Sequence, residues 1–187
     1  MGKRSDFKRR PMDDYETPPS AVQPLIPHLT GIRKFAEPCA GRGHLIRHLE
    51  AAGLECVFAC ELSTRMVPLT ETIIESGIDA LACGRECFAD ADAIISNPPW
   101  SRWLLHPLIW HFATIMPTWL LFDADWVHTK QSAALIRHCS HIVSVGRVKW
   151  IAKSRHTGKD NAAWHRFDRL HTAGPIFIGR EERRVAA

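Results

Sequence analysis

Short apolar runs alternate with helix-like segments along most of this 187-residue chain. The apolar runs are rich in β-branched and aromatic residues, and they predict strands at 32–38, 54–62, 79–83, 92–96, 118–126, 141–151 and 174–179. Helical periodicity predicts a short helix within 13–29 and longer ones at 39–53, 63–77, 103–116 and 130–140. Strands that alternate with helices pair in parallel through right-handed crossovers. The sequence therefore predicts an α/β fold with helices on both faces of a mostly parallel sheet.

Length and composition favour one soluble domain. The chain is long enough for one full core and too short for two comfortable ones. Hydrophobic residues make up 45% and charged residues 24%, which excludes disordered and fibrous classes. The most membrane-like stretch, 103–122, is interrupted by His106, Pro107, His111 and Pro117, so we expect a buried helix and strand there. The basic N-terminus is not followed by the apolar stretch of a secretory signal, and the six cysteines are scattered along the chain. We therefore expect the protein to be located in a reducing cytoplasm.

A glycine-rich turn follows the first predicted strand. Gly41 and Gly43 allow the backbone to approach a ligand at the positive end of the next helix. A dinucleotide fingerprint requires a small residue where Ile46 stands, which disfavours nicotinamide or flavin binding. Glu37 ends the first strand and can accept hydrogen bonds from a ligand amine. Glu61 ends the second strand and can accept hydrogen bonds from both hydroxyls of a ribose. A nucleoside that carries an amino acid fits both acids, although either one alone also fits a helix-capping or surface role.

The fourth predicted strand ends abruptly in the sequence SNPPW. Pro98 and Pro99 cannot continue a strand ladder, and they fix the backbone so that the Asn97 side-chain oxygen and the Pro98 carbonyl can both accept hydrogen bonds. Two acceptors suit one NH2 group, and the indole of Trp100 offers a face on which a base can stack. In a doubly wound sheet this strand end lies beside the glycine turn, so we expect one shared ligand. The alternative is a tight turn with a core tryptophan.

The sequences NPPW at 97–100 and EPCAGRG at 37–43 resemble motifs of S-adenosylmethionine-dependent class I amino-methyltransferases, especially the small phage-type DNA N6-adenine methyltransferases. The resemblance covers about 15–126, and afterwards 158–168 only looks like the polar loop before the family's last strand. It implies a Rossmann-like, mostly parallel seven-stranded sheet and S-adenosylmethionine over the glycine turn. It also implies a bacterial or phage-infected host cell, a DNA partner, and a target adenine at the catalytic residues Asn97, Pro98, Pro99 and Trp100.

The resemblance also implies a set of residues that bind the cofactor. Tyr15, Thr17 and Pro18 are similar to the aromatic-x-Thr-Pro element that closes over the methionine end of the cofactor. The family often has an acid near the end of the third strand that binds the adenine of the cofactor, and here CGREC at 83–87 offers Glu86. The full set is Tyr15, Thr17, Pro18, Glu37, Pro38, Cys39, Gly41, Gly43, Glu61 and Glu86.

Basic residues crowd two stretches, 1–12 and 147–169. The formal charge of +4 is by itself only compatible with a polyanionic partner. No large target-recognition domain is inserted, so we expect residues 1–187 to form a single methyltransferase domain with a mobile basic arm at 1–12. Reading of the substrate then falls to this arm, the loop after Trp100 and the 147–169 stretch, for which an ordinary solvated face is the alternative. The candidate nucleic-acid-binding residues are Arg102, Lys149, Lys153, Arg155, His156 and Lys159.

The cysteines do not favour a metal site. Cys56 and Cys60 are four residues apart, as are Cys83 and Cys87, which is a wider spacing than that of zinc knuckles. Cys56 and Cys60 are expected on one face of a strand. We therefore predict buried thiols and no metal.

The leading hypothesis is a site-specific DNA (adenine-N6) methyltransferase that uses S-adenosylmethionine and acts on a flipped adenine. The same acceptors could instead hold the NH2 group of cytosine N4, of an RNA base or of a protein glutamine. A third possibility is a catalytically silent nucleic-acid-binding module on a methyltransferase scaffold. The basic stretches and the irregular acid after the third strand are consistent with this last alternative.

Overall fold

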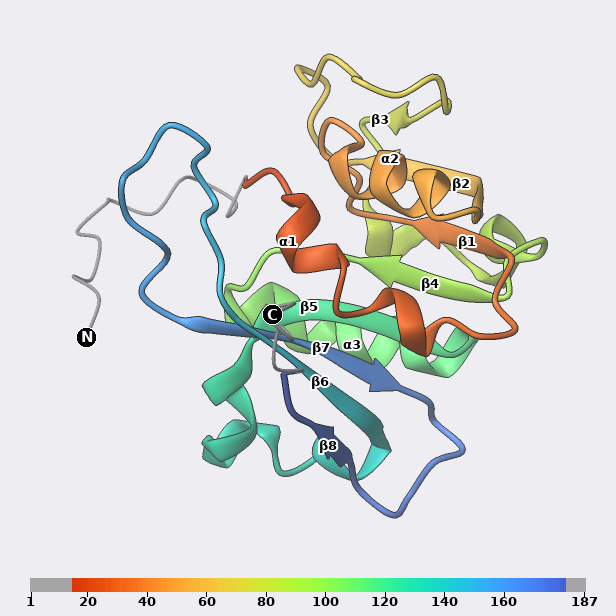
Figure 1. Cartoon of the computed structure of the whole chain (residues 1–187). Coiled ribbons are helices and arrows are strands. Elements are labelled where there is room, and N and C mark those ends of the chain that lie inside the picture. The colour runs from red at the N-terminus through yellow and green to blue at the C-terminus, as the bar shows by residue number, and fades with distance from the viewer. Residues whose placement is uncertain (1–14, 181–187) are drawn as a thin grey trace.

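An eight-stranded sheet forms the middle of the protein, with helices on both of its faces (Figure 1). The computed structural model describes residues 15–180. The strand order is β3-β2-β1-β4-β5-β7-β6-β8, and β7 is antiparallel to both of its neighbours while the other pairs are parallel. The strands are β1 (Lys34–Glu37), β2 (Glu55–Glu61), β3 (Glu75–Ser76), β4 (Ala93–Ser96), β5 (Thr118–Asp123), β6 (Cys139–Arg147), β7 (Asn161–Phe167) and β8 (Ile176–Ile178). The α-helices are α1 (Pro19–Val22), α2 (His44–Ala51) and α3 (Arg102–Ile115). The predicted α/β fold is confirmed, with eight strands in place of seven.

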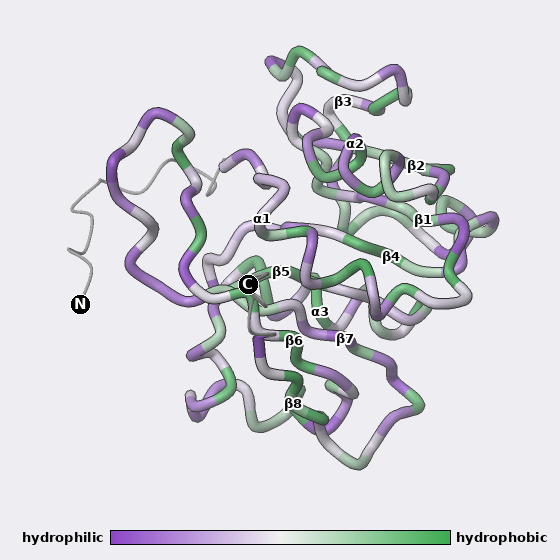
Figure 2. Tube along the Cα trace, in the orientation of Figure 1, coloured by the Kyte–Doolittle hydropathy of each residue, from purple (hydrophilic) through white to green (hydrophobic). Residues whose placement is uncertain are grey.

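Two hydrophobic clusters cover the two faces of the sheet. Successive side chains of a strand point to opposite faces, so Ile94 and Leu120 join the cluster under α3, whereas Ile95 and Leu121 join the cluster under α1 and α2. All four side chains of β4 are buried, as expected for a strand covered on both faces. Figure 2 shows the resulting apolar centre along β4 and β5. This rigid centre carries the loops at the carboxyl ends of the strands.

Helix α1 is attached to the sheet from a distant part of the chain. It begins at Pro19, where a proline is tolerated because the first turn of a helix leaves its N–H groups unpaired. The indole N–H of Trp164, on β7, donates to the carbonyl of Ala21 over 2.8 Å. This buried bond holds the segment that precedes the helix, residues 15–18, close to the carboxyl ends of β1 and β4.

Two of the elements predicted between β2 and β4 are wrong. Residues 63–77 form an irregular segment that ends in the short β3, and 79–83 contain the 3-10 helix η3 (Ala80–Ala82) instead of a strand. The side chains of Val67 and Ile73 are 68% and 84% exposed, so these two apolar residues do not contribute the buried face that would stabilise a helix. The segment lies over the glycine turn, where the backbone N–H of Leu69 donates to the carbonyl of Arg42.

Two further differences lie after β5. The helix predicted at 130–140 is replaced by 3-10 turns, η6 (Lys130–Ser132) and η7 (Ile136–His138), and the Ser132 hydroxyl donates to two nearby carbonyls in competition with a regular helix. Strand β7 lies in the stretch interpreted as a polar loop. Within β7, residues 162–165 are all buried because the strand pairs with β5 and β6 and is covered on both faces. Such a strand has no polar-apolar alternation from which it could be predicted.

A β-bulge separates the two cysteines of β2. The pairing of β1 with β2 shifts between Phe35 and Ala36, which leaves one extra residue on β2 at position 57. Cys56 consequently packs against the cluster under α1 and α2, whereas Cys60 belongs to the cluster under α3. The expectation that both thiols share one face is therefore wrong.

Within residues 15–180, no helix is long and apolar enough to cross a membrane. The apolar stretch 103–122 forms most of α3 and β5 instead, as predicted. The basic arm at 1–12 lies outside the described residues.

Gly43, which precedes α2, is expected to be intolerant of a side chain. Its φ is +83°, and an added Cβ would lie 2.6 Å from Cγ2 of Thr70. Gly31 is a matched control, because its φ is +86° but its Cβ would meet nothing within 4 Å. Backbone strain is expected to cost about 1–2 kcal/mol in both alanine variants, and Gly43→Ala should lose about 1–3 kcal/mol more through overpacking. Urea unfolding measures both; equal losses would show that the segment over Gly43 does not resist the new methyl group.

Candidate functional site

A cavity of about 410 Å³ opens at the carboxyl ends of β1, β2 and β4. Its volume is in the range of roughly 300–1,000 Å³ typical of small-molecule sites. The strand order reverses between β1 and β4, and such a switch point leaves a crevice at the carboxyl ends of parallel strands. The lining comes from residues 15–17, 37–42, 44–45, 61–63, 66, 78–81, 97, 99, 104 and 108.

The structure brings together most of the predicted catalytic and cofactor-binding residues. Those that line the cavity are Tyr15, Thr17, Glu37, Pro38, Cys39, Gly41, Glu61, Asn97 and Pro99. Those that do not line it are Pro18, Gly43, Glu86, Pro98 and Trp100. Of this second group, Gly43 shapes the turn, and Trp100 contacts the cavity residue Asn97.

Glu37 is the most buried charged side chain of the cavity. It is the last residue of β1 and only 1% exposed, and its Oε1 accepts a hydrogen bond of 3.1 Å from the backbone N–H of Cys39. Burial raises the pKa of Glu37 to about 8, and the neighbouring Glu61 carboxylate adds to this rise. A positively charged partner would stabilise the ionised form of this carboxyl group and lower its pKa again.

Glu61 fixes the glycine turn against the end of β2. Its two carboxylate oxygens accept hydrogen bonds from the backbone N–H groups of Gly41, at 2.8 Å, and Ser63, at 2.9 Å. A Cβ added at Gly41 would meet no atom within 4 Å, so the turn presents bare backbone to the cavity. Each carboxylate oxygen of Glu61 keeps a lone pair that a ligand hydroxyl can use.

The amide of Asn97 is held on both sides. Its Nδ2 donates to the hydroxyl of Thr17 over 3.0 Å, and its Oδ1 accepts from the indole N–H of Trp100 over 3.2 Å. The same indole N–H lies 3.1 Å from the carbonyl oxygen of Leu121 on β5. These bonds fix which end of the amide is the oxygen, and they leave one acceptor position on that oxygen for a further donor. Trp100 is therefore a half-buried ring in contact with the site, and not solely a core residue.

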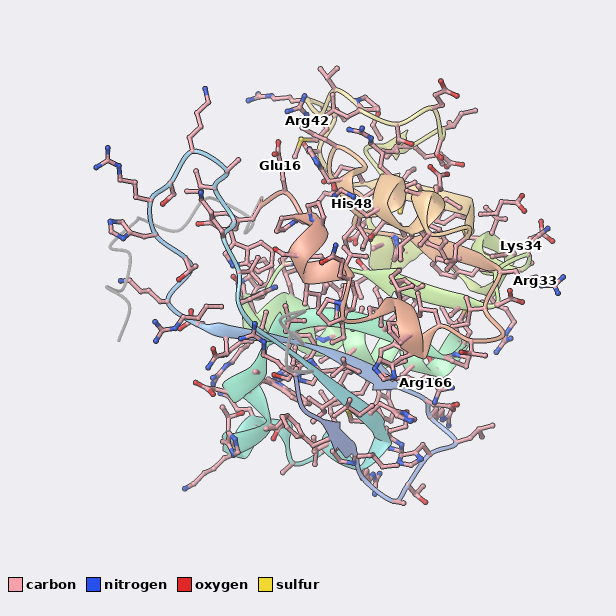
Figure 3. The ribbon with its side chains drawn as sticks, viewed as in Figure 1. Glu16, Arg33, Lys34, Arg42, His48 and Arg166 are labelled. Carbon is pink, nitrogen blue, oxygen red and sulfur yellow. The ribbon has the colours of Figure 1, made fainter. Side chains whose placement is uncertain are left out.

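Charged side chains close one rim of the cavity. Glu16 lies 3.3 Å from the Arg42 guanidinium and 3.4 Å from His44 Nε2. Figure 3 shows Glu16 and Arg42 directed toward one another from the N-terminal segment and the glycine turn. Sequence reasoning did not select Glu16, because nothing in the local pattern indicates its partner.

Asp79 was also missed, for a specific reason. It lines the cavity after β3, and its Oδ1 accepts a hydrogen bond of 2.9 Å from the backbone N–H of Leu81. The third strand was predicted at 79–83, four residues too late, so the acid that follows it was sought at Glu86. Glu86 is exposed and folds back over Gly84, away from the cavity lining.

The candidate nucleic-acid-binding residues are separate from the cavity and exposed. Arg102 begins α3 and donates to the side chain of Gln131. The others lie on the loop 148–160 between β6 and β7, which extends beyond the sheet as the lighter blue segment of Figure 1. These loop residues are Lys149, Lys153, Arg155, His156 and Lys159.

Two buried thiols lie behind the cavity lining, where the Cys60 thiol donates to the carbonyl of the cavity residue Pro38 over 3.4 Å. The sulfur atoms of Cys60 and Cys83 are 3.9 Å apart, and burial raises the pKa of both thiols. Across the part of the chain that the structure describes, no group of three or more Cys, His, Asp or Glu residues could hold a metal ion.

Comparisons with known proteins identify the fold. The sequence matches no known family model and no curated protein. Among solved structures, a candidate RNA methyltransferase of Pyrococcus horikoshii has a TM-score of 0.60 and 15% identity, with 93% of each chain covered. A candidate class I S-adenosylmethionine-dependent methyltransferase of Listeria monocytogenes has a TM-score of 0.60 and 13% identity over 87% of this chain and 64% of that one. A candidate hemolysin of Lactococcus lactis has a TM-score of 0.63 and 7% identity over 89% and 94%. At such identities the likeness concerns the fold, and this chain has the Rossmann-like fold of class I methyltransferases.

Glu37→Gln is expected to change how stability depends on pH. The unfolded chain loses the Glu37 proton near pH 4.5, whereas the folded protein keeps it up to about pH 8. The unfolded state binds fewer protons in this window, so Glu37 lowers the free energy of unfolding as pH rises, by at most about 1.4 kcal/mol per pH unit. A glutamine side chain at this position does not titrate, so the variant should lose less stability than the wild type between these pH values.

Chemical denaturation at a series of pH values tests this expectation. Several histidines titrate in the same window, so the difference between the two proteins is the informative quantity. Glu71→Gln is the control, because Glu71 is exposed. Parallel curves for Glu37→Gln and the wild type would show that Glu37 ionises normally.

Proposed function

We propose that this protein is an S-adenosylmethionine-dependent methyltransferase that acts on the exocyclic amine of a nucleic-acid base. The observation that carries the proposal is the oriented oxygen of Asn97, which shares one cavity with the buried carboxylate of Glu37. The Glu37 carboxylate suits the ammonium group of a cationic amino acid, and the Asn97 oxygen suits an NH2 donor.

The cavity residues fit S-adenosylmethionine. The raised pKa of Glu37 reports a carboxylate that a ligand ammonium group would stabilise in its charged form. Glu61 offers acceptors for ribose hydroxyls, and Asp79 offers a further acceptor after β3. The bare backbone at Gly41 leaves room for close approach. When bound, S-adenosylmethionine supplies a methyl group on a positively charged sulfur.

Asn97 is proposed to act on the nitrogen that receives the methyl group. The lone pair of an exocyclic amine is delocalised into its ring, which makes the nitrogen a poor nucleophile. A hydrogen bond accepted by the Asn97 oxygen would favour a more tetrahedral nitrogen with a localised lone pair. The rigid backbone of Pro98, which is buried and does not line the cavity, and of Pro99 fixes the position of Asn97, so the contribution of the protein is mostly positioning.

Adenine N6 in DNA is the specific substrate that we propose. Two features support it, namely the resemblance of 97–100 to the motif of DNA adenine methyltransferases and the exposed cations of the loop 148–160, which suit phosphates. In a duplex the adenine would have to leave the base stack before its amine could approach Asn97. A candidate RNA methyltransferase among the structural neighbours keeps an RNA base as the second candidate.

The substrate is identified by transfer of a labelled methyl group. The protein would be incubated with methyl-labelled S-adenosylmethionine and, in turn, with duplex DNA, single-stranded DNA, RNA and an unrelated protein. Digestion of the labelled product and mass spectrometry of its nucleosides should yield N6-methyladenine from DNA. N4-methylcytosine would show that the substrate base is cytosine, and label in RNA alone would show that the substrate is RNA and not DNA. Label in protein alone, or none at all, would overturn the proposed function.

Asn97→Ala is expected to abolish methyl transfer and to leave cofactor binding intact. The variant loses the side-chain oxygen but keeps the backbone N–H of residue 97, which lowers the pKa of Glu37 and thus favours its charged form. Gln23→Ala is the matched control, because it removes an exposed side-chain amide that does not line the cavity. Transfer rates and calorimetry with S-adenosylhomocysteine measure the two properties separately. Normal turnover by Asn97→Ala would rule out the role given to the amide.

Trp100→Phe separates orientation from stacking. Phenylalanine keeps an aromatic face but lacks the N–H that bonds to Asn97 and to the Leu121 carbonyl. The hydrogen bond that orients Asn97 contributes about 1–1.5 kcal/mol, and its loss is expected to lower kcat by about tenfold with little change in KM for nucleic acid. Trp100→Ala should also raise KM, because stacking on an aromatic ring contributes roughly 1–3 kcal/mol. A Trp100→Phe variant as active as the wild type would show that the indole N–H does not orient Asn97.

A further inference from the structure

Three aromatic rings from distant parts of the chain meet beside the cavity. The ring of Trp150, on the loop 148–160, lies 5.5 Å from that of Trp100 in a T-shaped contact and 6.4 Å from that of Tyr15 in a tilted one. Tyr15 lines the cavity, and Trp100 hydrogen-bonds to Asn97. Trp150 is thus a shared neighbour of the N-terminal segment and the candidate catalytic residues.

The Trp150 ring packs against the backbone of its own loop. The backbone N–H of Gly158 donates to the carbonyl of Val148 over 2.7 Å and closes the base of the loop. A Cβ added at Gly158 would lie 3.0 Å from Cδ1 and 3.1 Å from Nε1 of Trp150. The indole therefore packs directly on the Gly158 backbone, where only glycine leaves it this much room. Trp150 is half-buried, whereas the cationic side chains of the loop are exposed.

The exposed cations and the cavity are connected through these contacts. Lys149 and Lys153 flank Trp150 on the loop and suit the phosphates of a nucleic acid. On the cavity side, Thr17 bonds to Asn97, so the N-terminal segment and the catalytic residues share one network. Ordering of the loop by a polyanion would restrain Trp150, and ordering of the segment 15–17 by a ligand in the cavity would restrain the same ring.

We propose that Trp150 is a positioning residue that couples nucleic-acid binding on the loop 148–160 to S-adenosylmethionine binding in the cavity. The inference rests on the proposed function and adds its regulation. Either ligand restrains the same three rings, so the second ligand to bind orders fewer groups. Coupling of this kind is reciprocal, so each ligand should raise the affinity for the other by the same factor. We expect a factor of about 5–20, within the usual range for coupled sites.

The coupling factor is measured by binding alone. Calorimetry of the full-length protein with S-adenosylhomocysteine, in the absence and presence of a saturating mixed-sequence duplex DNA, yields the ratio of the two dissociation constants. In Trp150→Ala this ratio is expected to fall to about one, and Trp150→Phe should restore part of it. Gly158→Ala keeps the indole but displaces it, and it should also lower the ratio. Lys34→Ala is the matched control, because it removes an exposed lysine at the start of β1, away from the loop, and it should keep the wild-type ratio.

The outcomes distinguish the inference from the function on which it rests. If S-adenosylhomocysteine does not bind, the proposed function fails and the coupling fails with it. If both ligands bind but the wild-type ratio is one, or if Trp150→Ala and Gly158→Ala keep the wild-type ratio, the coupling role of Trp150 is overturned while the proposed function stands. Circular dichroism melting curves confirm that each variant is folded.

Discussion

The burial of the Glu37 carboxylate at the end of β1 is the constraint on which the site depends. An ionised carboxylate out of contact with water is costly, and the structure responds with a pKa raised to about 8. The glycine turn, the Glu61 carboxylate and the end of β4 all lie around this one group. A protein that needed only a stable core would have an apolar residue here. In the proposed function, a cationic ligand that shares the cavity stabilises this carboxylate.

The site combines rigid and adaptable parts. Glu37 and Asn97 stand at the ends of strands that are covered on both faces, so their positions are set by the core of the sheet. The N-terminal segment and the loop 148–160, by contrast, reach the site through a few side-chain contacts, among them the bond from Asn97 to Thr17 and the rings around Trp150. In the proposed function, the strands hold the acceptors in fixed positions and the connecting segments contact the nucleic acid.

The sequence was informative wherever local chemistry decides the structure. The strands that became β1, β2, β4 and β5 are apolar runs with clear ends, and the turn with Gly41 and Gly43 is followed by the helix that was predicted. It was misleading at 63–77, where Val67 and Ile73 face solvent, and at 130–140, where the bonds of the Ser132 hydroxyl compete with a regular helix. Strand β7 was missed for the opposite reason, because its burial depends on partners on both sides.

By itself, the sequence determined the α/β class, the acids at two strand ends and the Asn-Pro-Pro-Trp segment. These features depend on residue type and short spacing, which a linear sequence records. Only the tertiary structure decided that Asp79 and not Glu86 lines the cavity, that a bulge turns Cys56 and Cys60 to opposite faces, and that Trp150 meets Tyr15 and Trp100. The reason is physical, since each of these depends on strand register or on contacts between residues far apart in the chain, which cooperative packing of the whole sheet selects.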